Sequence, residues 1–304
     1  MSMLKPLCSY ASRARDGVRL LPVTLAWLRT LYSKPVDAIT DVVRTLRLPV
    51  IPVRQRMRLV AVALRAWIVR RGDGYALEIP KKGFLYFSGP TLNSDWNAFS
   101  DVFLTRCYET DFEGIAVIDV GAHKGYFATL ALLRGAARVC SVEPESRNYA
   151  LLQRASRSFQ QNDSVWEVRK RAVGSRREPV TLNLSGESWT HSLLPLPERG
   201  GRTEMAFEQV SMVPLADVIH EFSSPGMPLL VKIDIEGGEC EAVLGTAVDV
   251  WQKVDEVFLA FHTFAPCFPP SLTNHLEAAG LIKRREVDDV THYARSTTRD
   301  TTYD

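Results

Sequence analysis

The fold of this chain is decided by residues 115–133, which read IAVIDVGAHKGYFATLALL. Residues 115–120 are apolar and β-branched apart from Asp119, as expected for a strand that is buried on both faces. A turn with glycines at both ends, GAHKG, follows at 121–125, and residues 126–133 have the apolar content of a buried helix. A strand, a tight turn and a helix in this order predict an α/β domain with a parallel sheet.

The same alternation continues on both sides of this stretch. Further strands are predicted at 83–88, 138–142, 165–173, 179–184, 229–233 and 257–261, with a closing hairpin at 281–286 and 290–295. Helices are predicted at 97–108, 147–159, 239–248 and 270–279, and a polar loop precedes residue 229. Because the central strands are continuously apolar, we expect a Rossmann-like, doubly wound, mostly parallel sheet with helices on both faces. Ligands of such sheets bind beyond the carboxyl ends of the strands.

The net charge of +2 over 304 residues conceals two unlike segments. Residues 1–72 carry 14 Lys and Arg against three acids, whereas the remainder carries 23 basic and 32 acidic residues. We therefore predict a basic helical extension at 1–72, the main domain at 73–295 and a flexible tail at 296–304. Apolar residues at helical spacing in 57–68 leave two interpretations open. The segment contacts an anionic membrane or glycolipid, or it packs as a lid or dimer element on the acidic domain.

Composition excludes several classes of protein. The five cysteines are far apart and form no C-x-x-C, which argues against a zinc site and a disulfide framework and indicates a reducing compartment. No uninterrupted apolar run reaches about 18 residues, and no secretory signal is recognisable. We expect a cytoplasmic protein, with peripheral membrane contact through residues 1–72 as an addition. No nucleic-acid module is recognisable, so no nucleic-acid partner is predicted.

The first two strand-end loops predict a nucleoside ligand. Gly121 and Gly125 are spaced G-x-x-x-G, which is neither the dinucleotide G-x-G-x-x-G nor a P-loop and disfavours an NAD-dependent oxidoreductase. Asp119 would repel a pyrophosphate but attract an ammonium group. Glu143 ends the next strand, where a carboxylate accepts hydrogen bonds from two ribose hydroxyls or else caps the following helix. S-adenosylmethionine fits this description.

The loops after the next two strands carry candidate catalytic groups. Asp234, Glu236 and Glu239 lie within VKIDIEGGE at 231–239, where they face a ligand or cap a helix. His262 ends the following strand and has a suitable ordinary pKa for proton transfer, unless a neighbouring backbone group satisfies it. Two carboxylates and an imidazole also suit a divalent metal. The spacing does not demand one, so no metal is predicted.

Three segments resemble the FkbM family of S-adenosylmethionine-dependent methyltransferases. They are VIDVGAHKGYFA (117–128), SVEPES (141–146) and LVKIDIEGGECEAVLG (230–245), and the resemblance covers about residues 97–262. The family usually has Asn where this chain has His123. The resemblance implies a class I methyltransferase fold. It also implies roles for single residues: Asp119, Gly121 and Gly125 would line the methionine part of the cofactor, Glu143 would hold the ribose, and Ala172 and Val173 would border the adenine. Asp234 and Glu236 would lie between cofactor and acceptor, with Asp234 also counted as cofactor-binding. Ser192 of the THSLL stretch is a further candidate.

These observations together predict a methyltransferase that uses S-adenosylmethionine. The acceptor that the resemblance implies is a hydroxyl group of a sugar, glycan, glycolipid or natural product. The predicted catalytic residues are Asp234, Glu236 and His262, because removal of the hydroxyl proton calls for a positioned base. The alternative is a non-catalytic cofactor-binding protein that docks on a membrane or partner through its basic N-terminal segment. The sequence predicts no oligomeric state.

Overall fold

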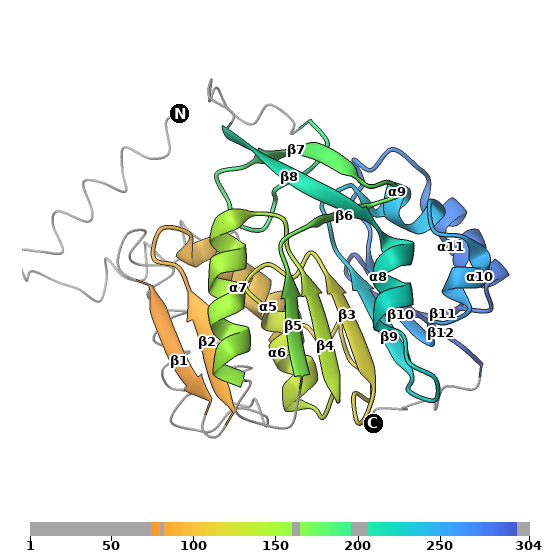
Figure 1. Cartoon of the computed structure of the whole chain (residues 1–304), viewed down its shortest axis with the longest axis horizontal. Helices are drawn as coiled ribbons and strands as arrows, with labels where there is room; N and C mark the ends of the chain where they lie inside the picture. The colour runs from red at the N-terminus through yellow and green to blue at the C-terminus, as the bar shows by residue number, and fades with distance from the viewer. Residues whose placement is uncertain (1–73, 80–81, 160–164, 196–205, 297–304) are drawn as a thin grey trace, which may run out of the picture.

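A seven-stranded sheet forms the centre of the protein (Figure 1). The computed structural model describes residues 74–79, 82–159, 165–195 and 206–296, so the helices predicted within 1–72 and their membrane role lie outside the described residues. The strand order is β11-β12-β10-β9-β3-β4-β5. The strands are β3 (Ala116–Val120), β4 (Arg138–Val142), β5 (Val165–Arg169), β9 (Leu229–Ile233), β10 (Glu256–Ala260), β11 (Ile282–Val287) and β12 (Val290–Ala294).

Strands β3, β4, β5, β9 and β10 are parallel, and the β11–β12 hairpin adds an antiparallel edge. From β3 the chain proceeds to β4 and β5 on one side, and later places β9 and β10 on the other side. The strand order therefore reverses between β3 and β9. In an open parallel sheet this switch point creates the crevice where ligands bind.

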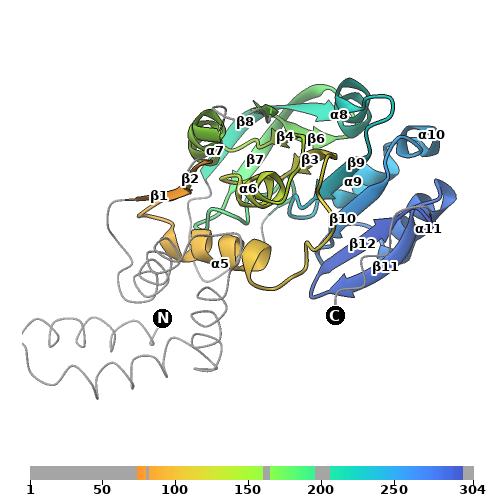
Figure 2. The same ribbon diagram turned by 90° about the horizontal axis from the view of Figure 1, so that it is seen from below.

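Helices cover both faces of the sheet, as the continuously apolar strands predict. Alternate residues of β3 point to opposite faces, so Val117 lies in one apolar core and Ile118 in the other. Figure 2 shows α6 and α8 on opposite sides of the sheet. The helices are α5 (Leu92–Phe103), α6 (Tyr126–Leu133), α7 (Ser146–Phe159), α8 (Leu215–Phe222), α9 (Glu239–Leu244), α10 (Val248–Trp251) and α11 (Pro269–Ala278). The doubly wound α/β fold is thus confirmed.

Two small sheets flank the central one. A hairpin of β1 (Tyr75–Ile79) and β2 (Gly83–Phe87) packs beside α7, and β6 (Ala172–Gly174), β8 (Ala206–Pro214) and β7 (Glu178–Leu184) form a three-stranded sheet. The single strand predicted at 165–173 is wrong, because β5 ends at Arg169 and the chain enters the second sheet at Ala172.

The polar loop predicted before residue 229 is also wrong, since it contains β8 and α8. The first six residues of β8 are mostly exposed and include Glu208, Gln209 and Ser211, which hides a strand from a search for apolar runs. The helix predicted at 97–108 begins earlier, at Leu92, and also ends earlier, at Phe103. The helix predicted at 239–248 is interrupted at Gly245, which separates α9 from α10.

A disulfide joins Cys240 to Cys267, with the two Cα atoms 5.9 Å apart. The prediction that the cysteines are unpaired is therefore wrong. Cys240 is the second residue of α9, after β9, and Cys267 precedes α11 after β10. Neighbouring parallel strands therefore bring two cysteines 27 residues apart into contact. The reducing compartment inferred from unpaired cysteines loses this support. In the described part of the chain, no helix is long and apolar enough to span a bilayer.

Candidate active site

The loops that follow β3, β4, β9 and β10 meet at the carboxyl edge of the sheet. Gly121, with φ +75°, lets the first and third of these loops touch, since a Cβ there would lie 1.8 Å from the carbonyl oxygen of Asp234. Gly125 plays a different part, because its Cβ would collide with Trp166 and Leu152 in the core. Gly121 borders both cavities described below, whereas Gly125 lines neither.

Asp119 lies beneath the first loop rather than in it. Its side chain is fully buried, neither carboxylate oxygen accepts a hydrogen bond, and the Lys232 ammonium lies 3.4 Å from Oδ1. Burial raises the pKa of this carboxyl group, although Lys232 opposes the shift. Lys232 also donates to the Gly121 carbonyl oxygen at 2.9 Å. The structure thus brings Asp119 next to a lysine of the chain itself, and Asp119 lines neither cavity.

The first cavity lies at the end of β4 and beside β6, the first strand of the three-stranded sheet. It has a volume of about 60 Å³ and is lined by Glu143, Ala172 and Val173, three of the predicted cofactor residues. The Glu143 carboxylate accepts hydrogen bonds from the backbone N–H groups of His123 at 2.8 Å and Glu145 at 2.9 Å. Burial raises the pKa of Glu143 to about 8. Each carboxylate oxygen retains a further acceptor position, which suits a ribose diol.

This first cavity is smaller than the roughly 300 Å³ or more that small-molecule pockets usually provide. The segment that carries Ser188, Trp189, His191 and Leu193 lines it.

The second cavity, of about 370 Å³, adjoins the first. Five residues border both cavities: Gly121, His123, Trp189, Asp234 and Glu236. Its walls combine aromatic side chains such as Tyr108 and Phe127 with carboxylates such as Asp289. The arrangement places a larger compartment beside the one that contains Glu143.

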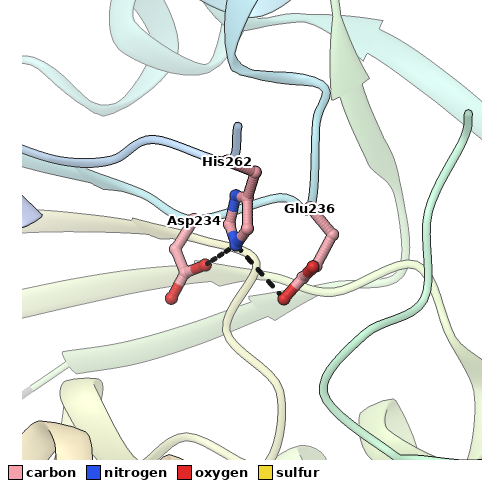
Figure 3. A group of neighbouring side chains, drawn as sticks. All are labelled: Asp234, Glu236 and His262. Atoms are coloured by element: carbon pink, nitrogen blue, oxygen red, sulfur yellow. Dashed lines mark ion pairs between the residues drawn. The ribbon is translucent and has the colours of Figure 1, made fainter. Parts of the chain in front are cut away.

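The three predicted catalytic residues come together at this border (Figure 3). Nε2 of His262 lies 3.3 Å from Oε1 of Glu236 and 3.9 Å from Oδ1 of Asp234. We name Asp234, Glu236 and His262 the His262 cluster. Glu236 has φ +52°, a conformation that costs a residue with a side chain about 1–3 kcal/mol. The Ser192 hydroxyl holds this backbone by donating to the Glu236 carbonyl oxygen at 2.5 Å.

Glu239, which the sequence marks only as an acid of the third loop, orients His262 from behind. Its buried Oε1 lies 2.8 Å from Nδ1 of His262 and accepts the N–H groups of Ile235 and Gly237. Burial lowers the pKa of His262, but the hydrogen bonds to Glu236 and Glu239 prevail and raise it to about 11. Burial raises the pKa of Glu236, although His262 opposes the shift.

A second group of polar side chains, which the sequence analysis did not predict, surrounds Asp95 and includes His123. Lys124 Nζ donates to Oδ1 of Asp95 at 2.6 Å, and the Ser188 hydroxyl donates to the same oxygen at 2.8 Å. His123 Nε2 lies 2.9 Å from the Ser188 hydroxyl oxygen. We name Asp95, His123, Lys124 and Ser188 the Asp95 cluster. One feature of the sequence could have indicated this cluster. Asp95 is an acid among the buried residues of α5, which include Leu92, Trp96 and Phe99.

Residues 119–281 match the Methyltransferase FkbM domain, whereas no curated protein matches the sequence. The crystal structure of methyltransferase FkbM from Methylobacillus flagellatus KT is 15% identical with a TM-score of 0.40, over 86% of this chain and 59% of that chain. Magnesium protoporphyrin IX methyltransferase from Synechocystis PCC 6803, with bound SAM, is 10% identical with a TM-score of 0.39, over 67% and 81%.

These TM-scores are low, so the family assignment rests on the sequence match and not on the structural likeness. The match spans more than half of the chain and includes the four strand-end loops that form the two cavities. The chain belongs to the FkbM methyltransferase family.

Proposed function

We propose that this protein transfers the methyl group of S-adenosylmethionine to a hydroxyl group of a sugar, glycolipid or natural product. The observation that carries the proposal is that Asp234 and Glu236 border both the Glu143 cavity and the 370 Å³ cavity, with His262 beside them in the second. A methyl donor in the first compartment and an acceptor in the second would meet beside these three side chains.

The residues of the first compartment fit the cofactor. Glu143 offers two carboxylate oxygens to the ribose hydroxyls, and Ala172 and Val173 offer an apolar wall to the adenine. We assign Gly121 to the methionine part, because it is one of the five residues that border both compartments. Asp119 and Gly125 support this loop from below and behind.

The transfer needs alignment and a base. The acceptor oxygen forms a bond to the methyl carbon while the carbon–sulfur bond breaks and its electron pair stays on sulfur. The hydroxyl proton must then leave. With a pKa of about 11, His262 is an imidazolium at neutral pH and does not accept this proton. The base role therefore passes to Glu236, whose pKa is raised by burial, with His262 orienting its carboxylate.

The composition of the second compartment indicates the class of acceptor. Asp101, Asp288 and Asp289 line it together with Asp234 and Glu236. Carboxylates accept hydrogen bonds from hydroxyl groups and repel anions. A neutral, hydroxyl-rich acceptor fits these walls better than a phosphorylated or otherwise acidic one.

The test has two parts. Calorimetric titration of the full chain with S-adenosylhomocysteine, with NAD as control ligand, should show binding of the former alone, and Glu143→Ala should weaken it. An acceptor screen with labelled S-adenosylmethionine should then compare neutral sugars with sugar phosphates. A matched control is Glu286→Gln, an exposed change on β11 away from both cavities. Cofactor binding without transfer to any acceptor would favour the non-catalytic alternative.

A further inference from the structure

We propose that the His262 cluster is a binding site for a divalent metal ion of the Mn²⁺ class, which holds the acceptor hydroxyl. This inference rests on the proposed function, whose acceptor compartment it specifies. Nε2 of His262 and one carboxylate oxygen each of Asp234 and Glu236 all lie within 4.8 Å of one another. An octahedral ion with bonds of about 2.1 Å separates neighbouring ligand atoms by about 3 Å and opposite ones by about 4.2 Å. The two distances from Nε2 of His262, 3.3 Å to Glu236 and 3.9 Å to Asp234, lie between these two values.

The imidazole is oriented as a metal ligand. A histidine that binds a metal usually donates its other ring N–H to a carboxylate, which fixes the tautomer and the direction of the ring. Here Nδ1 of His262 is 2.8 Å from the fully buried Glu239, and Nε2 faces Asp234 and Glu236. Glu239 is itself fixed by two backbone N–H groups.

The two oxygens of Asp234 are divided between different tasks. Oδ2 lies 3.4 Å from both Lys232 Nζ and the Tyr108 hydroxyl oxygen, whereas Oδ1 lies on the side of His262. Asp234 can therefore keep its lysine and still present one oxygen to an ion. The same lysine is already shared with Asp119, so two cations, Lys232 and His262, face the four carboxylates of Asp119, Asp234, Glu236 and Glu239. A divalent ion would balance this excess of negative charge.

The cluster also leaves room for further ligands. Asp234, Glu236 and His262 all line the 370 Å³ cavity, so three protein ligands leave coordination positions open toward the acceptor compartment. Two carboxylates suit Mg²⁺ or Mn²⁺, and the imidazole favours a transition metal over Mg²⁺. A vicinal diol of a sugar can occupy two such positions and would bring one hydroxyl oxygen to the methyl donor.

With an ion bound, the same carbon–oxygen bond forms and the same carbon–sulfur bond breaks, but the hydroxyl proton leaves by a different route. Bound to the ion, the acceptor hydroxyl becomes more acidic, as metal-bound water does. The oxygen–carbon bond forms, the carbon–sulfur bond breaks, and the hydroxyl proton passes to water in the cavity, because the three side chains act as ligands.

The test uses the full chain after removal of metals with a chelator. Titration with Mn²⁺, followed by the electron paramagnetic resonance signal of the free ion, should show one bound ion per chain. Glu239→Gln should weaken binding about 10–100-fold, as expected for a residue that orients a ligand. Asp234→Asn and Glu236→Gln should weaken it further. Asp288→Asn is the matched control, because it removes a carboxylate from the same cavity at a residue outside the cluster, and it should leave Mn²⁺ binding unchanged.

A spectroscopic readout places the ion on the imidazole even if a variant binds poorly. Wild-type protein with Mn²⁺ should show electron spin-echo modulation from a coordinated nitrogen, and His262→Gln should lose it. No bound Mn²⁺ in the wild type, or equal binding in Asp234→Asn and Glu236→Gln, would overturn the site. If the protein binds S-adenosylhomocysteine but does not bind Mn²⁺, the ion site is overturned and the methyltransferase proposal stands. If it binds Mn²⁺ but does not bind S-adenosylhomocysteine, the ion site stands and the proposed function is overturned.

Discussion

The Asp95 cluster and the His262 cluster differ in how their charges are balanced. In the Asp95 cluster, one carboxylate faces one ammonium at 2.6 Å, and both side chains are almost completely buried, with relative exposures of 0% and 2%. In the His262 cluster, Asp234 and Glu236 share one imidazole with Glu239, and the group faces a cavity of about 370 Å³.

This difference in charge balance indicates that the Asp95 cluster stabilises the fold and that the His262 cluster takes part in the chemistry. A buried pair with matched charges has no capacity left for a ligand, so its effect is to hold α5, the first loop and the Ser188 segment together. An excess of carboxylates beside a cavity is costly to maintain without a ligand, substrate or ion. Changes in the first cluster should therefore reduce stability, and changes in the second should reduce activity.

The largest expected effect is on turnover. Replacing Glu236 by Gln removes either the proposed base or a proposed metal ligand, and loss of general-base catalysis lowers rates about 10²–10⁴-fold. Affinity for S-adenosylhomocysteine should stay near the wild-type value, because Glu143 and the adenine wall are unchanged. Steady-state kinetics and calorimetry of the same preparation check both statements. A variant with full turnover would remove Glu236 from the chemistry.

The next effect is on stability. Lys124→Met leaves the Asp95 carboxylate buried without its cation, which should cost about 3–5 kcal/mol of the free energy of unfolding. Urea denaturation measures the loss, and the double variant Asp95→Asn with Lys124→Met should recover part of it. If Lys124→Met lowers the free energy of unfolding no more than Glu236→Gln does, the proposed division between the two clusters is wrong.

Loss of the disulfide should affect the His262 cluster but not the Asp95 cluster. Replacing Cys240 and Cys267 by Ser opens a loop of 27 residues, which is worth about 3–4 kcal/mol by loop entropy. The bond joins the segments that carry Glu239 and His262, so Mn²⁺ affinity and turnover should fall as well. The contacts of Asp95 lie elsewhere. Urea denaturation and Mn²⁺ titration of the double variant test these expectations, and unchanged values in both would contradict them.

The smallest effect is a pH dependence of stability. The folded-state pKa of His262 is about 11 and its ordinary value is 6.5, so the folded protein binds this proton more tightly than the unfolded chain. The stabilisation is therefore complete below about pH 6.5 and is lost as the pH rises toward 11.

The measurement compares wild type with His262→Gln by urea denaturation at several pH values in the presence of a chelator. The difference in unfolding free energy should be about 1–3 kcal/mol near pH 6, typical of hydrogen bonds to a charged group, and should shrink by pH 9–10. A difference that grows with pH would show that His262 is neutral in the folded protein.

Much of the fold follows from local sequence patterns. The predicted helix at 126–133 and strand at 138–142 agree with α6 and β4 at both ends, because continuous apolar runs bounded by glycine or polar turns leave few alternatives. β8 escaped prediction because half of a strand in a small, one-sided sheet is exposed, and its polar residues resemble a loop.

For the site, the chemical groups and the edge of the sheet where they lie could be read from strand ends and motifs alone. Parallel strands end at one edge, so Glu143, Asp234, Glu236 and His262 could be assigned to neighbouring loops before any distance was known. Only the tertiary structure decided the partners. The pairing of Cys240 with Cys267, of Asp95 with Lys124, and of Glu239 with His262 joins residues that are 27, 29 and 23 positions apart. Such contacts depend on the packing of loops and helices around the sheet, and neither periodicity nor motif spacing encodes that packing.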